Sequence, residues 1–183
     1  PLTLAETASV FGEMLTFRKL LEDAKNQKER KVLLAGKVED MINTVIRQIA
    51  FYDFECKLHD ARCQGELTPD DINAIWMSVQ GESLGPAFEF MKGYETFWAY
   101  IPHFVHSPFY VYAYAFGDGL VNALYAVYQD NPEGFQEKYF TMLKAGGSMH
   151  HKDLLTPFGL DASDPKFWDK GLSMIASLID ELE

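Results

Sequence analysis

The sequence predicts an all-α fold, and three features of its 183 residues support this prediction. Apolar residues recur every three or four positions over long stretches, which is the spacing of one helix face. No stretch shows the two-residue alternation of a half-buried β-strand. Turn residues such as those of "GELTPDD" separate the periodic stretches. We therefore expect a single helical domain over residues 1–183, with long helices packed as a bundle-like or orthogonal array.

The first helices are predicted over residues 3–24 and 27–62. Alanines, leucines and charged pairs favour helix in the first range. The second range carries apolar side chains at helical spacing, at Val38, Ile42, Val45, Ile46, Ile49 and Phe54. The turn sequence "GELTPDD" then begins a third helix, with Thr68 as its N-cap and Pro69 at its first position.

The rest of the chain is predicted as an aromatic-rich connecting stretch followed by three helices. Residues 81–108 break the helical pattern with several glycines and prolines, so we expect short turns and loops packed on the core. Ser107 and Pro108 then begin the helix "FYVYAYAFGDGLVNALYAVYQ". Another helix lies in "NPEGFQEKYFTMLKAGG" and ends at Gly146, and the last is "SDPKFWDKGLSMIASLIDELE".

Composition and charge exclude several classes of protein. Apolar residues make up 48% of the chain, which is typical of a globular protein with a core. The formal net charge of −11 would repel a phosphate backbone, so we expect no nucleic-acid partner. No apolar run is long enough to span a membrane. Cys56 and Cys63 are expected to be reduced thiols, which indicates a cytoplasmic protein.

Two glutamates stand out in the first predicted helix because its other faces are largely apolar. Glu6 and Glu13 lie about 20° apart around a helix, on one predicted buried stripe. Buried carboxylates are costly unless they are paired, protonated or bound to a cation. Glu6 could instead complete a capping box that begins at Thr3, and Glu13 could form a salt bridge.

Three stretches resemble the C-terminal segments of the oligoendopeptidase F and thimet oligopeptidase family of zinc metallopeptidases. They are "LAETASVFGEML", "IPHFVHSPFYVYAYAFGDGL" and "LKAGGSMHHKDLLTPFGLDASDPKFWDKG". In that family an H-E-x-x-H helix supplies two zinc ligands and the general base, and a glutamate on a following helix supplies the third ligand. The resemblance implies that Glu6 is this third ligand and that Glu13 supports the site from outside the ligand set.

None of the five histidines begins or ends an H-E-x-x-H motif. We therefore expect the chain to be the C-terminal part of the peptidase catalytic domain, which by itself is inactive and does not retain the one Zn²⁺ of the complete enzyme. The partners implied are oligopeptide substrates, the missing N-terminal part, and a second copy joined through the exposed cleft face. The alternative interpretation is a non-catalytic helical module for binding or dimerisation.

The segment "HFVHSPFYVYAY" contains the second group of candidate catalytic residues. Peptide hydrolysis places negative charge on the carbonyl oxygen, and tyrosine hydroxyls or histidine N–H groups can stabilise it. The resemblance places the family's transition-state donors here, so we select His106 and Tyr110 first, then His103 and Tyr112. Helical spacing also puts Tyr110 and Tyr114 on one face. These rings could instead be ordinary core residues.

Overall fold

The computed structural model describes residue 4 and residues 6–183, and the chain divides into two compact units. Unit 1 comprises the described part of Pro1–Ile42 together with Phe116–Glu183, and unit 2 comprises Asn43–Ala115. The described residues contain helices and turns but no β-strand, so the predicted all-α class is confirmed. The expectation of a single domain stays a prediction.

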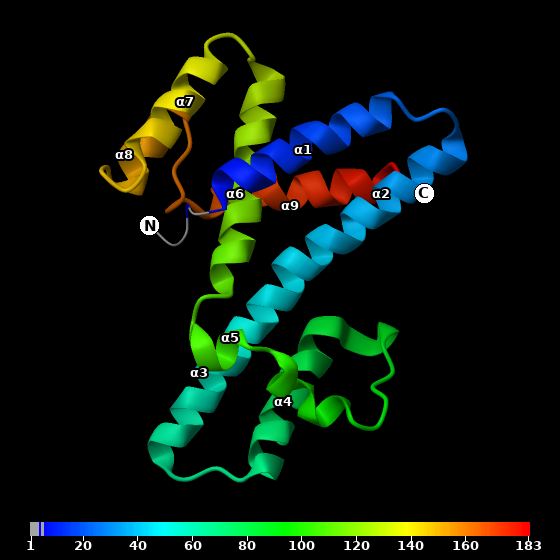
Figure 1. The fold of residues 1–183 in the computed structure, drawn as a ribbon, viewed down its shortest axis with the longest axis vertical. Helices are drawn as coiled ribbons and strands as arrows, with labels where there is room; N and C mark the ends of the chain where they lie inside the picture. The colour runs from blue at the N-terminus through cyan, green and yellow to red at the C-terminus, as the bar shows by residue number, and fades with distance from the viewer. Residues whose placement is uncertain (1–3, 5) are drawn as a thin grey trace. The chain divides into compact units, whose positions relative to one another are not determined.

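Unit 1 is built mainly from helices at the two ends of the chain (Figure 1). Its elements are α1 (Thr7–Glu22), α2 (Gln27–Ile42), most of α6 (Tyr112–Asp130), α7 (Phe135–Ala145), α8 (His151–Leu155), the 3₁₀ turn η5 (Thr156–Phe158) and α9 (Pro165–Asp180). Helix α2 packs against both α1 and α9. Arg18 and Arg30 form ion pairs with Glu181, which joins these helices to the C-terminal turn.

Helix α1 buries only one of its faces. Phe11, Met14, Phe17 and Leu21 are buried, whereas Leu15 is 43% exposed and Leu20 is 49% exposed. The apolar faces of this helix are therefore not all covered. The apolar side chains outside this one stripe find no covering element among the described residues, so amphipathic packing of a single face decides the orientation of the helix.

Unit 2 contains the middle of the chain and an aromatic core. Its elements are η2 (Asn43–Arg47, a π-helical turn), α3 (Gln48–Gln64), α4 (Pro69–Leu84), the 3₁₀ segments η3 (Gly85–Ala87) and η4 (Tyr94–Tyr100), the short helix α5 (His103–His106) and the start of α6. Helix α4 packs against α3 and η4. Phe51 and Phe54 of α3 pack on Trp76 of α4 at ring-centroid distances of 5.6 and 5.2 Å.

Some predicted helix ends agree with the structure and others do not, and the helix predicted over residues 27–62 is divided by η2 into α2 and α3. Thr68 caps α4 in a reciprocal capping box with Asp71, and Gly146 follows the end of α7, as predicted. The stretch predicted as turns contains η3, η4 and α5, although α4 extends into it as far as Leu84. Helix α6 begins at Tyr112 rather than at Phe109, because Phe109 has a positive φ of 58° that no α-helix accommodates.

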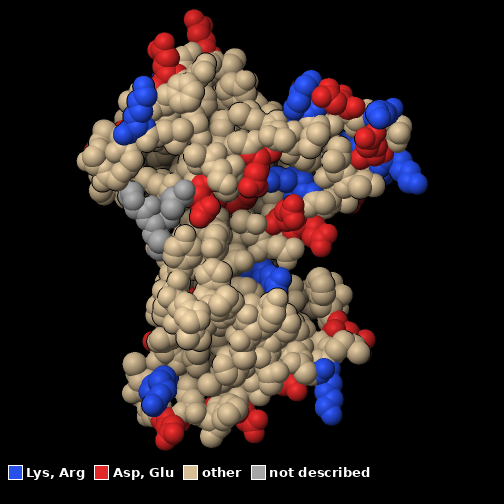
Figure 2. All heavy atoms as spheres, in the orientation of Figure 1, with Lys and Arg blue, Asp and Glu red and all other residues tan. Residues whose placement is uncertain are grey.

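Charged side chains of opposite sign lie near one another on the face drawn in Figure 2. Independently of this view, Lys19 lies 3.0 Å from Asp23 and 3.4 Å from Glu22. In this view the basic side chains form no continuous patch of the kind that binds a phosphate backbone. Among the described helices, none has the length and apolar content needed to cross a membrane.

Candidate functional site

A compact group of one histidine and two tyrosines lies in unit 2. The Nε2 atom of His103 is 3.2 Å from the hydroxyl oxygen of Tyr114, within hydrogen-bond distance. The Tyr110 ring stacks on His103 at 6.1 Å and meets the Tyr114 ring edge-on at 5.4 Å. We call these three residues the His103–Tyr110–Tyr114 cluster. All three are half-buried, so their polar atoms lie at the border between the aromatic core and solvent.

Three short elements bring these side chains together. His103 is the first residue of α5, whose chain then enters a tight turn in which Tyr110 N–H donates to Ser107 C=O at 3.2 Å. Pro108 and Phe109 occupy the two central positions of this turn, and Phe109 has the left-handed conformation. Tyr110 follows directly, and Tyr114 lies in the first turn region of α6. The turn therefore reverses the chain so that Tyr110 faces back toward His103.

Two other predicted residues of this segment lie apart from the cluster's ring contacts. His106 ends α5 and its side chain is exposed. The Tyr112 ring packs edge-on against Tyr52 of α3 at 5.3 Å. Of the four selected residues, the structure thus groups His103 with Tyr110, and it adds Tyr114, which sequence spacing had already placed on the same side as Tyr110.

Glu55 is a buried carboxylate in the same unit that sequence analysis missed. It is 1% exposed on α3, and its Oε1 accepts a hydrogen bond from Phe109 N–H at 2.8 Å. Burial raises the pKa of Glu55, while the Phe109 N–H bond and the charges of His59 and His103 act in the opposite direction. The signal was present in the sequence, because Glu55 falls on the apolar stripe of Phe51 and Leu58.

In unit 1, Glu6 and Glu13 have different surroundings, which corrects the expectation of one shared buried stripe. Glu6 is half-buried, and its Cβ would lie 3.4 Å from a Cβ built at Gly117 of α6. Glu13 is exposed, because α1 turns its other face to the core. Glu6 is the N-cap residue of α1, but its side chain makes no capping hydrogen bond. The predicted partner in a capping box, Thr3, lies outside the described residues.

The described residues do not by themselves form a metal site. No group of three or more histidine, cysteine, aspartate or glutamate side chains within residue 4 and residues 6–183 is arranged to hold an ion. A catalytic zinc takes three protein ligands and a water molecule. Glu6 can therefore be only one of the ligands of such a site, and the donors among the described residues do not complete a zinc site by themselves.

A buried aspartate on α6 is the most perturbed carboxylate of unit 1. Asp118 is 2% exposed, and its Oδ2 accepts a hydrogen bond from Asn122 Nδ2 at 2.8 Å. Burial raises its pKa from 3.8 to about 6; Lys37 and the Asn122 bond oppose this change and the charge of Glu13 adds to it. Its environment favours the protonated form far more than water does.

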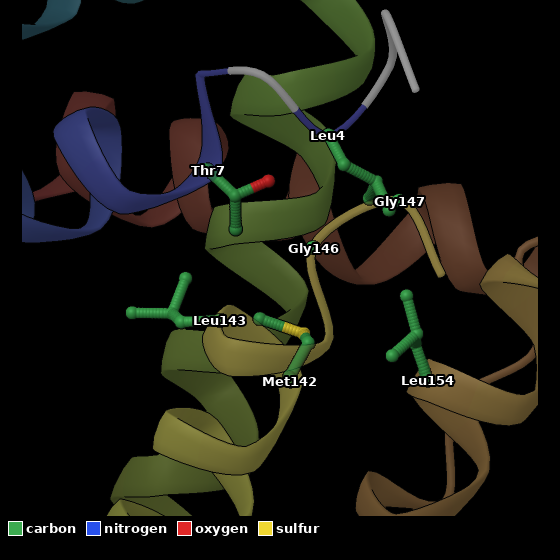
Figure 3. Close-up of a pocket in the computed structure, with 7 residues that line it drawn as sticks. All are labelled: Leu4, Thr7, Met142, Leu143, Gly146, Gly147 and Leu154. Atoms are coloured by element: carbon green, nitrogen blue, oxygen red, sulfur yellow. The ribbon is translucent and has the colours of Figure 1, made fainter. Parts of the chain in front are cut away.

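Unit 1 also has a small, mainly apolar pocket of about 280 Å³ between the start of α1 and the end of α7 (Figure 3). Its lining residues are Leu4, Thr7, Met142, Leu143, Gly146, Gly147 and Leu154. The buried Thr7 hydroxyl makes no hydrogen bond with the described part of the chain. The pocket can hold a small, mainly apolar group, and the Thr7 hydroxyl can form a hydrogen bond with one polar atom of that group.

Comparison with known families and proteins adds to this description. Residues 1–174 match the family described as "Peptidase family M3". The chain is 31% identical to "Oligoendopeptidase F, plasmid" of Lactococcus lactis subsp. cremoris, over 100% of this chain and 30% of that protein. It is 30% identical to "Oligopeptidase PepF" of Bacillus subtilis, over 98% of this chain and 27% of that protein.

A solved structure agrees with these sequence relatives. The crystal structure of oligoendopeptidase-F from Enterococcus faecium superposes with a TM-score of 0.86 at 28% sequence identity. The superposition covers 98% of this chain and 34% of the crystallised chain. The chain thus spans about a third or less of the length of each of these three proteins.

Proposed function

Because the chain belongs to peptidase family M3, we propose that it supplies the C-terminal part of the catalytic domain of a zinc-dependent oligoendopeptidase. The substrates in this proposal are short peptides, cleaved at internal bonds. Two observations support it: the match over residues 1–174, and relatives named as oligoendopeptidases of which the chain spans about 30%. The role of a part, rather than of a whole enzyme, agrees with the lack of an H-E-x-x-H motif in the sequence.

The His103–Tyr110–Tyr114 cluster is the observation that carries the catalytic half of this proposal. Hydrolysis of a peptide bond passes through a tetrahedral state whose carbonyl oxygen gains negative charge. Among the described side chains, none forms a hydrogen bond with the Tyr110 hydroxyl, so this O–H group is free to donate to such an oxygen. The His103–Tyr114 contact of 3.2 Å fixes the orientation of the ring on which Tyr110 stacks.

His106 and Tyr112 keep a place in the proposal as secondary candidates. The exposed ring of His106 can reach a ligand in solution, but no described side chain orients it. Tyr112 is oriented by Tyr52, on a different group of rings from the cluster. A donor that is held in place before the reaction stabilises charge better than a mobile one, so we favour Tyr110 and His103.

We propose that Glu6 is one ligand of the zinc and that Glu13 supports the site from outside the ligand set. The half-buried Glu6 carboxylate is not used as a helix cap, which leaves its oxygens available for a cation. Two further ligands must come from elsewhere, because the described chain does not complete the set. We further propose a cytoplasmic protein that pairs with the rest of its catalytic domain and that can associate with a second copy.

The direct test compares the 183-residue chain with a longer polypeptide that also contains the residues encoded upstream of Pro1. We expect an H-E-x-x-H motif within a few tens of residues upstream of Pro1, and zinc-dependent cleavage of a quenched fluorescent peptide by the longer polypeptide alone. Cleavage by the isolated chain would contradict its role as a part. Absence of the motif, together with an inactive longer polypeptide, would favour a helical binding module.

A further inference from the structure

The left-handed turn beside the cluster has an unusual residue at its critical position. Positive φ at the third position of such a turn is normally provided by glycine, because a Cβ atom is unfavourable there. Here that position is held by Phe109, with φ of 58°. In the part of the chain that the structure describes, it is the one non-glycine residue with positive φ. An unfavourable backbone state of this kind persists only where surrounding contacts hold it.

Glu55 provides the contact that holds this turn. The Phe109 N–H, which points out of the turn, donates to Glu55 Oε1 at 2.8 Å. A hydrogen bond to a carboxylate is stronger than one between neutral groups. The Phe109 ring adds contacts with His59 at 4.8 Å and with Tyr52 at 6.1 Å, and both of these residues lie on α3 with Glu55. Helix α3 therefore contacts the turn through one hydrogen bond to a carboxylate and two ring contacts.

Packing alone does not account for a glutamate at position 55. The residue is 1% exposed, and its Oε2 atom is buried without a hydrogen-bond partner among the described residues. Burying a carboxylate with an unsatisfied oxygen is costly, and an apolar side chain of similar volume, such as methionine, would avoid this cost. The carboxylate is therefore better explained by its hydrogen bond to Phe109 N–H than by packing in the core.

We propose that Glu55 is a positioning residue, which holds the Ser107–Tyr110 turn in its left-handed form and so keeps Tyr110 against His103 and Tyr114. Its value to catalysis rests on the proposed function, but the mechanical role concerns this chain alone. Loss of the carboxylate should thus change the Ser107–Tyr110 turn and the position of Tyr110, while the fold of unit 2 persists.

The test uses nuclear magnetic resonance on the 183-residue chain and needs no peptide cleavage. Glu55→Met keeps the side-chain length and removes the acceptor. We expect the Phe109 amide to exchange with solvent roughly 10- to 100-fold faster, because a hydrogen bond to a charged group is lost. We also expect the ring contacts of Tyr110 with His103 and Tyr114 to weaken, while the melting temperature stays the same or rises.

Two further variants separate positioning from general stabilisation. Glu55→Gln retains an acceptor oxygen, so its Phe109 amide should exchange at a rate between those of wild type and Glu55→Met. The ring contacts of Tyr110 with His103 and Tyr114 should persist in this variant. Glu66→Met, which removes an exposed carboxylate of the same unit, should change neither readout. Unchanged Phe109 exchange and unchanged ring contacts in Glu55→Met would overturn the proposal.

If Glu55→Met does not fold, the double variant Glu55→Met/Phe109→Gly decides the question. Glycine adopts positive φ without penalty, so the turn should no longer depend on the carboxylate. Recovery of the fold and of the backbone turn in Glu55→Met/Phe109→Gly supports the proposal, and failure to recover overturns it. A peptide-cleavage assay that fails in the longer polypeptide bears on the proposed function alone, since none of these readouts involves activity.

Discussion

The Nε2 atom of His103 lies 3.2 Å from the Tyr114 hydroxyl, and this contact joins the start of α5 to the start of α6. A histidine bonded through one ring nitrogen has its ring plane fixed and its other nitrogen directed elsewhere. Tyr110 stacks on that fixed ring. The cluster is therefore oriented by contacts within the chain itself, and in the proposed peptidase such prior orientation is the condition under which donors stabilise a developing negative charge.

The first prediction concerns the Tyr110 hydroxyl in the longer polypeptide. Tyr110→Phe removes one O–H group and almost no volume, so the stability should change little. If this hydroxyl donates to the transition state, kcat should fall by about 100- to 1000-fold with KM nearly constant. Steady-state kinetics and a thermal melt measure both quantities.

Tyr100→Phe is the matched control for this experiment. Tyr100 is 75% exposed in the same unit, and loss of its hydroxyl should leave kcat unchanged. Equal kcat values for wild type, Tyr110→Phe and Tyr100→Phe would make Tyr110 a core ring and transfer the role to another residue of the segment, with Tyr114 and Tyr112 tested next.

The pairing of Tyr110 with Tyr114 could be predicted from sequence, but the reason for it could not. Four-residue spacing places the two rings on one side of a helix. The structure keeps that pairing although Tyr110 precedes α6, because the Ser107–Tyr110 turn leads directly into the helix. The left-handed Phe109 was unpredictable, since its residue type disfavours positive φ and its stabilising partner Glu55 lies 54 positions away.

The exposure of Glu13 was also beyond sequence analysis. Helix α1 carries apolar residues on several faces, and the pattern alone does not say which face other elements cover. In the structure Phe11 stacks on Phe135 at 5.8 Å, which fixes the buried face and leaves Glu13 outside. The helix ends at Thr68 and Gly146 were predictable, because a local hydrogen bond decides the first and glycine the second.

A second prediction concerns zinc in the longer polypeptide. Glu6→Gln replaces a carboxylate with a neutral amide, which is a poor ligand, so the zinc content after dialysis should fall sharply. Glu13→Gln is the matched comparison and should lose less zinc than Glu6→Gln. Loss of a supporting group typically costs about 10- to 100-fold in affinity or activity. Atomic absorption on both dialysed variants measures retention. Full zinc and full turnover in Glu6→Gln would show that Glu6 is not a ligand.

A third prediction concerns the close approach of α6 and α9 in unit 1. A Cβ atom built on Gly171 would lie 3.2 Å from Gly119 Cα and 3.3 Å from Gly119 O. Because these are backbone atoms, the helices must separate to admit it. Gly171→Ala should therefore lower the free energy of unfolding by about 1–3 kcal/mol, as overpacked cores do. Urea denaturation of the 183-residue chain measures this change.

Gly36→Ala is the control for that substitution. Gly36 lies inside α2, and a Cβ atom there meets nothing within 4 Å. Alanine is the better helix former, so this variant should be more stable than wild type by up to about 1 kcal/mol. If the free energy of unfolding falls in Gly171→Ala and rises in Gly36→Ala, the loss arises from the contact between α6 and α9. Changes of the same sign in both variants would contradict this explanation.

The last prediction concerns the buried Asp118 and the pH dependence of stability. Its folded-state pKa of about 6 lies above the ordinary 3.8, so the native chain holds a proton that the unfolded chain releases between these values. Stability should therefore fall as pH rises through this window, and the loss should be complete above the folded-state pKa. The shift corresponds to roughly 3 kcal/mol if the whole effect acts on unfolding.

Asp118→Asn removes the titrating proton and keeps the side-chain shape, so it should flatten this part of the stability profile. At neutral pH the variant should be more stable than wild type, because no charge is buried beside Asn122. Asp130→Asn alters an exposed carboxylate on the same helix and should leave the profile unchanged. Urea denaturation of all three proteins between about pH 4 and pH 7 spans the window. A wild-type stability that rises through it, or an Asp118→Asn profile parallel to wild type, would show that the carboxylate stays ionised and that Lys37 outweighs its burial.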